Sequence, residues 1–211
     1  MSLADIRKSY TLGGLRRADL DPNPIAQFNR WMGQALQASL PEPTAMTLAT
    51  AGKACQPSAR IVLLKGVDER GFLFFTNYDS RKGRELAENP HAALVLYWTE
   101  LERQVRVTGT VAKASREESE KYFQSRPRGH QLGAWVSNQS ELIAKRDVLE
   151  QRLSELEQKY PGTVPLPPNW GGYLLAPIEI EFWQGRPNRL HDRFRYMQQS
   201  GGAWLIDRLA P

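Results

Sequence analysis

Apolar and polar positions follow two different periods along this chain. In residues 25–40 the apolar side chains recur at the spacing of an α-helix. Later segments follow the pattern of strands, and we place them at 45–50, 58–67, 72–78, 91–98, 104–114, 173–176, 178–183, 189–197 and 203–209. Strands so closely spaced, with short turns between them, predict an α+β protein built on a predominantly antiparallel barrel or sandwich.

Helical patterns flank these strands. We expect a short helix near 81–89, a second at 115–125 and a long one at 141–160. Ser115 is followed three residues later by Glu118, which is the capping-box pattern of a helix start. The sequence therefore predicts an N-terminal arm at 1–24 and a single domain at 25–211, with a helical insertion at about 115–160.

The composition indicates a globular protein and argues against membrane-spanning and disulfide-rich classes. Of the 211 residues 41% are hydrophobic and 24% charged, and no apolar run approaches the roughly 18 residues that span a bilayer. The first residues carry charge and do not resemble a signal peptide, so we expect a cytoplasmic protein without a membrane segment. A single cysteine, Cys55, excludes an internal disulfide. His91, His130 and His191 lie far apart, so we expect no metal site.

The segment from Arg60 to Lys82 carries the first candidate chemistry. Two strand-like runs, 60–65 and 71–78, flank a polar loop that ends in glycine, which predicts a hairpin. A helix follows, capped by Asp79 or Ser80, with Arg81 and Lys82 in its first turn. Cations are unfavourable at this positive end of a helix unless an anion such as phosphate binds there. A solvated basic turn is the alternative interpretation.

A second cluster of charge lies near the C-terminus. If residues 189–194 form a strand, Arg189, His191 and Arg193 share one face, where they are suited to a phosphate or carboxylate. A solvated sheet face is the other interpretation. The net charge of +5 also admits a basic nucleic-acid-binding barrel, but the basic residues are scattered along the chain.

Taken together, seven ordered motifs resemble the pyridoxamine 5′-phosphate oxidases. They are Arg60-Ile-Val-Leu-Leu-Lys65, Thr76-Asn with Ser80-Arg-Lys82, Leu101-Glu-Arg-Gln-Val105, Ser125-Arg-Pro-Arg128, Gly133-Ala-Trp-Val-Ser137 with Gln139-Ser140, Phe182-Trp-Gln-Gly185 and Arg189-Leu-His-Asp-Arg193. The resemblance implies a split β-barrel homodimer with FMN at the subunit interface. It also implies oxidation of pyridoxine or pyridoxamine 5′-phosphate to pyridoxal 5′-phosphate, with O2 reduced to H2O2.

The resemblance further implies the residues of the site. FMN would be bound by Arg60, Ile61, Val62, Leu63, Leu64, Lys65, Phe75, Thr76, Arg81, Lys82 and Gln104, and by Gln139, Ser140, Trp183 and Arg193 of the other subunit. The substrate phosphate would meet Lys65, Tyr122, Arg126 and His130. Arg189, Leu190 and His191 would lie over the pyridine ring, with Arg189 and His191 as the catalytic pair, and Arg7 and Tyr10 of the arm would close the site.

Three positions depart from the family pattern. His130 stands where serine is usual, Glu42 where aspartate is usual, and Phe75 where tyrosine is usual. In addition, strict strand alternation places Arg60 and Lys65 on opposite faces, so their contact with one site requires a bulge, backbone contacts or ligands on two sides. Another split-barrel flavin enzyme, such as a flavin reductase, and a vitamin B6 carrier remain alternatives to the oxidase.

Overall fold

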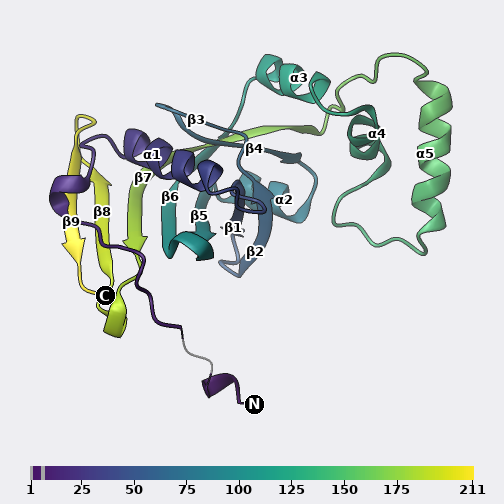
Figure 1. Ribbon diagram of the computed structural model, residues 1–211. Helices are drawn as coiled ribbons and strands as arrows, with labels where there is room; N and C mark the ends of the chain where they lie inside the picture. Colours follow the sequence, from purple (N-terminus) through teal and green to yellow (C-terminus); the bar gives the residue numbers. More distant parts are fainter. Residues whose placement is uncertain (1, 6–7) are drawn as a thin grey trace.

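The computed structural model describes residues 2–5 and 8–211, and its centre is a large antiparallel sheet (Figure 1). The 9-stranded sheet has the order β2-β1-β5-β6-β7-β4-β3, with β8 paired to β7 and β9 paired to β8. The strands are β1 (Ala45–Ala51), β2 (Pro57–Leu63), β3 (Gly66–Asp68), β4 (Gly71–Asn77), β5 (His91–Trp98), β6 (Arg103–Lys113), β7 (Trp170–Gln184), β8 (Asp192–Gln198) and β9 (Trp204–Leu209). The α+β antiparallel fold expected from the sequence is confirmed.

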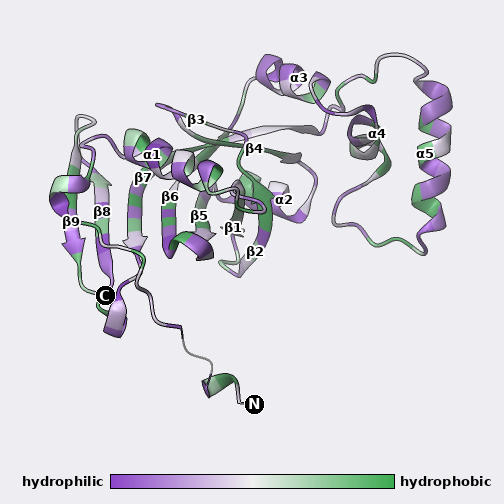
Figure 2. Cartoon of the chain, in the orientation of Figure 1, coloured by the Kyte–Doolittle hydropathy of each residue, from purple (hydrophilic) through white to green (hydrophobic). Residues whose placement is uncertain are grey.

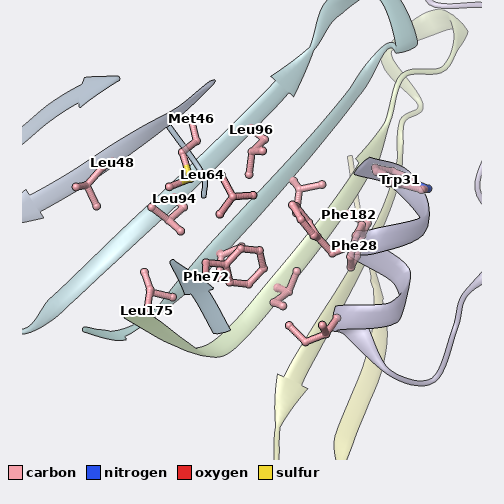
Figure 3. Packing of buried hydrophobic residues seen from close by; sticks show 14 of the residues in the cluster. Phe28, Trp31, Met46, Leu48, Leu64, Phe72, Leu94, Leu96, Leu175 and Phe182 are labelled. Carbon is pink, nitrogen blue, oxygen red and sulfur yellow. The ribbon is translucent and has the colours of Figure 1, made fainter. Parts of the chain in front are cut away.

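Helix α1 (Pro24–Gln37) covers the core of the sheet. Asn23 caps its first turn, and Pro24 occupies a position where a backbone N–H is not needed. Its buried face sets Phe28 against Phe72 at 4.9 Å between ring centroids and Trp31 against Phe182 at 5.2 Å (Figure 3). The helix ends before the predicted residue 40 because Ser39 adopts a left-handed φ of 53°.

The predicted hairpin between residues 60–65 and 71–78 is confirmed only at its tip, from Lys65 to Leu73, and is wrong for the residues before Lys65. Strand β2 pairs along its whole length with β1, from Ala45 opposite Leu63 to Ala51 opposite Pro57. On its β2 side, β4 pairs with the short β3 and not with β2, and Gly71 at φ +134° lies in the turn between β3 and β4. The chain changes partner at Leu64 and Lys65, because the Leu64 N–H bonds to Thr44 O and the Lys65 N–H to Leu73 O. The apolar residues of β2 are compatible with pairing to β1 or to β4, so the local sequence alone does not specify the partner strand.

The long strand β7 joins the two halves of the sheet. It pairs with β6, β4 and β8, where the sequence had predicted two separate strands, 173–176 and 178–183. The register shifts where Thr108 and Gly109 of β6 face Glu179 and Pro177, so the strand continues past the proline through a bulge. In Figure 2, bands of green and purple alternate along β5 and β6, as expected for strands buried on one face.

The segment before β8 is not a strand. The 3₁₀ turn Pro187–Arg189 has left-handed backbone at Asn188 (φ 57°) and Arg189 (φ 61°), and β8 begins only at Asp192. The predicted common strand face for Arg189, His191 and Arg193 is therefore wrong. Short 3₁₀ turns also occur at Leu3–Asp5, Arg17–Asp19 and Thr99–Leu101.

Helices α2 (Arg81–Glu88), α3 (Arg116–Gln124), α4 (Arg128–Val136) and α5 (Asp147–Lys159) complete the chain. The capping box is confirmed, since Ser115 Oγ accepts a hydrogen bond from the Glu118 N–H at 3.0 Å. Helix α5 begins at Asp147, six residues later than predicted, and α4 was not predicted as a helix. Figure 1 places α3, α4 and α5 at the end of the molecule opposite β8 and β9. Among the described residues, no helix is long and apolar enough to cross a membrane.

Candidate functional site

A cavity of about 910 Å³ lies between strand β2, the start of α2 and helix α4. Its size falls in the range of small-molecule binding sites. Fourteen of the residues expected from the sequence line it, namely Arg60, Ile61, Val62, Leu63, Lys65, Phe75, Thr76, Arg81, Lys82, Tyr122, Arg126, His130, Gln139 and Ser140. We call this space the phosphate-side cavity, after the phosphate groups that the sequence predicts there. Arg60 and Lys65 both reach it because the strand breaks between them, which resolves the conflict with strict strand alternation.

The start of α2 forms the cationic end of the phosphate-side cavity. Ser80 caps the helix, because its Oγ accepts a hydrogen bond from the Gly83 N–H. The buried Lys82 Nζ donates to Thr76 Oγ1 at 3.0 Å, to Ser80 Oγ at 3.2 Å and to Gln139 Oε1 at 2.9 Å. Burial first, and then the charge of Arg60, lower the pKa of Lys82 to about 8. A buried ammonium group beside a helix start favours an anion as ligand.

Glu85 links the two arginines of this end. Its Oε2 accepts hydrogen bonds from Thr50 Oγ1 at 2.5 Å and Ser58 Oγ at 2.6 Å, and lies 3.3 Å from Arg60 Nη2. Its Oε1 accepts from Arg81 Nε at 2.9 Å. Burial alone would raise the pKa of this carboxyl, but the hydrogen bonds from these four side chains lower it to about 2. Glu85 is therefore ionised at neutral pH.

Aromatic rings and one arginine form the other wall. Phe75 stacks on Tyr122 at 3.9 Å between ring centroids and on Trp170 at 5.6 Å. Arg126 lies over the Trp170 ring at 4.7 Å, and its buried Nη1 has no hydrogen-bond partner in the described part of the chain. A buried donor without a partner is costly, so this nitrogen is suited to an acceptor brought by a ligand.

The remaining candidates gather in a second place, next to the arm. A cavity of about 1000 Å³ is lined by Lys8, Ser9, Tyr10, Arg186, Asn188, Arg189 and His191. The His191 ring lies 4.7 Å from Trp183 and 5.7 Å from Tyr10, centroid to centroid. Tyr10 fits here because Gly185 lacks a Cβ, which would lie 2.8 Å from the tyrosine. We call the residues that line this cavity, together with Trp183, the pyridine-side cluster, after the substrate ring that the sequence predicts there.

His191 is held as a neutral imidazole with a defined tautomer. Its Nδ1 accepts a hydrogen bond from the Arg186 backbone N–H at 3.1 Å, so in the neutral ring the proton resides on Nε2. Partial burial and then the charge of Arg189 lower the pKa of His191 below its ordinary value. At neutral pH the ring therefore presents an N–H donor at Nε2.

Several predicted residues lie outside the phosphate-side cavity. Leu64 is buried in the core, and Gln104 pairs in register with Trp183, beside the pyridine-side cluster. Arg193 binds the buried carboxylate of Glu181 through its Nε at 2.8 Å and its Nη2 at 3.0 Å, so a protein carboxylate already faces it. Leu190 is exposed in the connection before β8. Arg7 lies outside the described residues.

Gln139 and Ser140 require a correction. The sequence analysis assigned them to the other subunit, but Gln139 contacts Lys82 and Thr76 of its own chain, and Ser140 Oγ accepts a hydrogen bond from the Arg81 N–H at 3.2 Å. The loop after α4 folds back onto α2, and this return was hidden because α4 was not expected to be a helix.

Two residues that shape the phosphate-side cavity belong to none of the predicted motifs. Glu85 and Trp170 were not singled out, although the first holds two arginines and the second stacks below Arg126. A signal for Glu85 existed, because it follows Arg81 by one helical turn, where an ion pair is expected. No three His, Cys, Asp or Glu side chains are grouped for metal binding within residues 2–5 and 8–211.

Comparison with known proteins identifies the family. A family model described as pyridoxamine 5′-phosphate oxidase matches residues 32–160, which is more than half of the chain. The chain belongs to the pyridoxamine 5′-phosphate oxidase family. A second family model, described as a pyridoxine 5′-phosphate oxidase C-terminal dimerisation region, matches residues 170–211.

Individual members of this oxidase family are similar to the chain over its full length. A pyridoxine/pyridoxamine 5′-phosphate oxidase from Paraburkholderia phymatum is 61% identical, with 100% of this chain and 99% of the relative covered. One from a Nostoc species is 60% identical with the same coverage. Among solved structures, PhzG from Burkholderia lata in complex with tetrahydrophenazine-1-carboxylic acid superposes with a TM-score of 0.90 at 33% identity, covering 97% of this chain and 100% of that one. An FMN-binding protein from Nostoc punctiforme shares the fold, with a TM-score of 0.72 at 19% identity and coverage of 91% and 100%.

FMN, the cofactor of this family, fits the residues that the structure brings together. A phosphate at the start of α2 would meet a buried ammonium group, two arginines and the positive end of the helix dipole. The apolar side chains of β2 and the stacked rings of Phe75 and Tyr122 are suited to flat aromatic groups.

Proposed function

We propose that this chain is an FMN-dependent oxidase that converts pyridoxine 5′-phosphate and pyridoxamine 5′-phosphate to pyridoxal 5′-phosphate, with O2 reduced to H2O2. The observation that carries the proposal is full-length identity of about 60% to relatives with this activity in their names. PhzG, with another ligand, is only 33% identical. The oxidase is therefore favoured over a different flavin enzyme of the same fold.

In this proposal the start of α2 holds the cofactor phosphate. Arg60, Arg81 and Lys82 supply positive charge, and the helix start adds the positive end of its dipole. FMN bound there would supply two-electron redox chemistry: the substrate carbon that bears the amine or hydroxyl would be oxidised, O2 would take up two electrons and two protons as H2O2, and water would release ammonia from the amine substrate. The protein's part is to bind, orient and exclude water.

The substrate phosphate is assigned to the aromatic wall. Arg126 offers the unpartnered Nη1, and Lys65, Tyr122 and His130 line the same cavity. Arg126 supplies a planar set of N–H donors that suits a phosphate. The stacked rings of Phe75, Tyr122 and Trp170 restrict how that arginine can move, which fixes the position of the phosphate.

Arg189 and His191 are assigned to the pyridine ring. The neutral His191 presents its Nε2–H as a hydrogen-bond donor, and Arg189 brings positive charge to the same cavity. Tyr10 packs on both Trp183 and His191, so the arm covers this cluster. These contacts support a role in orienting the reacting carbon.

A second copy of the chain is needed to complete the site. The phosphate-side cavity and the pyridine-side cluster have no lining residue in common within the described residues, and Figure 1 shows α4 and β8 on opposite sides of the molecule. The match of residues 170–211 to a dimerisation region supports a homodimer in which each copy contributes one half. We also assign residues 25–211 to one FMN-binding domain with the helical insertion, preceded by the arm, and place the enzyme in the cytoplasm.

An aerobic assay tests the proposal. Purified protein should be yellow or gain flavin absorbance with FMN, and should release pyridoxal 5′-phosphate and hydrogen peroxide in equal amounts from pyridoxine 5′-phosphate. A B6 carrier would release no peroxide, a flavin reductase would need a nicotinamide reductant, and a nucleic-acid-binding barrel would show steeply salt-dependent DNA or RNA binding. A colourless protein that takes up no FMN contradicts the proposal.

A further inference from the structure

Glu85 is an ionised carboxylate in a place where the ligand is also an anion. It lies on the second turn of α2, and its side chain is 12% exposed. Both of its oxygens are used inside the protein, Oε2 by Thr50, Ser58 and Arg60 and Oε1 by Arg81. A negative charge beside an anion site weakens anion binding by simple repulsion, so its presence calls for another role.

The contacts of Glu85 point to that role. Arg60 comes from β2 and Arg81 from the first turn of α2, and Glu85 is the carboxylate that joins the two. With its Nε committed to Glu85, Arg81 has its two terminal nitrogens left as donors for a ligand. Arg60 is held in turn by Thr50 Oγ1, Ser58 Oγ and the Leu48 carbonyl oxygen.

We propose that Glu85 is the positioning residue of the cofactor phosphate site: it anchors both guanidinium groups, so that the terminal N–H donors of Arg81 and the positive charge of Arg60 face the phosphate. This inference rests on the proposed function, since it requires FMN in the phosphate-side cavity. Two fixed arginines bind a phosphate more tightly than two mobile ones, because less side-chain freedom is lost on binding.

Charge balance is consistent with this role. Arg60, Arg81 and Lys82 carry three positive charges, and Glu85 offsets one of them. The remaining two match a phosphate monoester, which carries about −1.5 to −2 charges at neutral pH. Without Glu85 the ligand-free cavity would hold three uncompensated cations, whose mutual repulsion moves the arginines apart.

The substitution Glu85→Gln distinguishes a positioning role from simple charge repulsion, because the two predict opposite changes in FMN affinity. The amide keeps the shape of the side chain but removes a negative charge, so repulsion alone predicts tighter FMN binding. Loss of the fixed arginines predicts weaker binding, by about tenfold, which corresponds to about 1.4 kcal/mol. Titration of the apo-protein with FMN, followed by quenching of flavin fluorescence, measures this change.

Riboflavin is the matched ligand because it lacks the phosphate. We expect Glu85→Gln to weaken FMN binding about tenfold and to change riboflavin binding less than about twofold. Equal loss for both ligands would assign Glu85 a general structural role and would overturn the proposal, as would unchanged or tighter FMN binding. Glu88→Gln is the control, since Glu88 lies on the same helix and accepts a hydrogen bond from the Lys53 N–H instead; it should bind FMN like the wild type.

Two further variants test the proposal independently of the stability of Glu85→Gln. If Glu85→Gln does not fold, Glu85→Asp keeps the charge but shortens the side chain, and the same selective loss of FMN affinity is expected. In the Arg81→Ala background, Glu85→Gln should cost clearly less FMN affinity than in the wild type, because one of its two targets is gone. Wild-type protein that binds no FMN would contradict the proposed function itself, whereas normal wild-type binding with no selective effect at Glu85 contradicts only this inference.

Discussion

Lys82 Nζ donates a hydrogen bond to Gln139 Oε1 at 2.9 Å, and this contact joins the start of α2 to the loop after α4. Two motifs 57 residues apart in the sequence thus form one wall of the phosphate-side cavity. The acceptors around Lys82 are neutral oxygens of Thr76, Ser80 and Gln139. An anionic ligand would therefore supply the negative charge that this buried ammonium group lacks.

FMN affinity should depend on pH through Lys82. Burial and the charge of Arg60 lower its pKa from 10.5 to about 8 in the ligand-free protein. A phosphate favours the charged form, so FMN affinity should fall as the pH rises above about 8, by at most about tenfold per pH unit. Lys82→Met should bind more weakly at pH 7 and lose this dependence; fluorescence titrations between pH 7 and 9 measure both effects.

The lowered pKa of Lys82 also predicts how the unfolding free energy of the ligand-free protein depends on pH. Between about pH 8 and 10.5 the unfolded chain binds more protons at Lys82 than the ligand-free folded protein does. The contribution of Lys82 to stability should therefore rise with pH in that window. The comparison is the urea-unfolding free energy of wild type and Lys82→Met, and a difference between them that stays constant across the window would contradict the assignment.

Arg126 should govern affinity for the substrate phosphate. Removal of a charge-assisted hydrogen bond costs about 1.5–3 kcal/mol, so Arg126→Ala should raise KM for pyridoxine 5′-phosphate by about 10- to 100-fold. Its FMN affinity should stay near that of the wild type. Arg128→Ala is the control, because Arg128 bonds to the Tyr160 and Gly162 carbonyl oxygens and does not line the cavity. Equal effects of the two substitutions would refute the role of Arg126.

Arg189 should affect turnover and not cofactor binding. Arg189→Ala is expected to lower kcat/KM at least about tenfold while FMN affinity changes less than about twofold. Because Arg189 has a left-handed φ of 61°, Arg189→Gly separates the side chain from backbone strain. Both variants should lose activity alike. An Arg189→Gly enzyme with wild-type turnover, measured by peroxide release, would show that the guanidinium is dispensable.

Local signals in the sequence were sufficient for many elements. The Ser115–Glu118 capping box, and a cap of α2 at Asp79 or Ser80, were readable because each depends on side chains within one turn of the helix; the structure shows that Ser80 is the cap. The arginine and lysine at the start of α2 were also predicted to face a ligand, and both line the cavity; the anion itself stays a prediction. Such features need no knowledge of distant contacts.

Features set by distant partners were not readable. Residues 60–63 pair with β1 and not with 71–78. Arg189 leaves the strand pattern through left-handed backbone that its residue type does not predict. The spacing from Arg81 indicates an ion pair for Glu85, but its contacts with Thr50, Ser58 and Arg60 of other strands are not readable from the sequence. The assignment of Gln139 to its own chain likewise required the fold of α4.

The central claim is that one site is completed by two copies of the chain. Mixing two inactive variants tests it most directly: Arg81→Ala/Lys82→Ala, altered in the phosphate-side cavity, and Arg189→Ala/His191→Ala, altered in the pyridine-side cluster. When they are unfolded and refolded together, about half of the dimers should be mixed, and each mixed dimer should hold one intact site. We predict recovery of about a quarter of wild-type peroxide release. A mixture as inactive as its separate components would contradict the shared site.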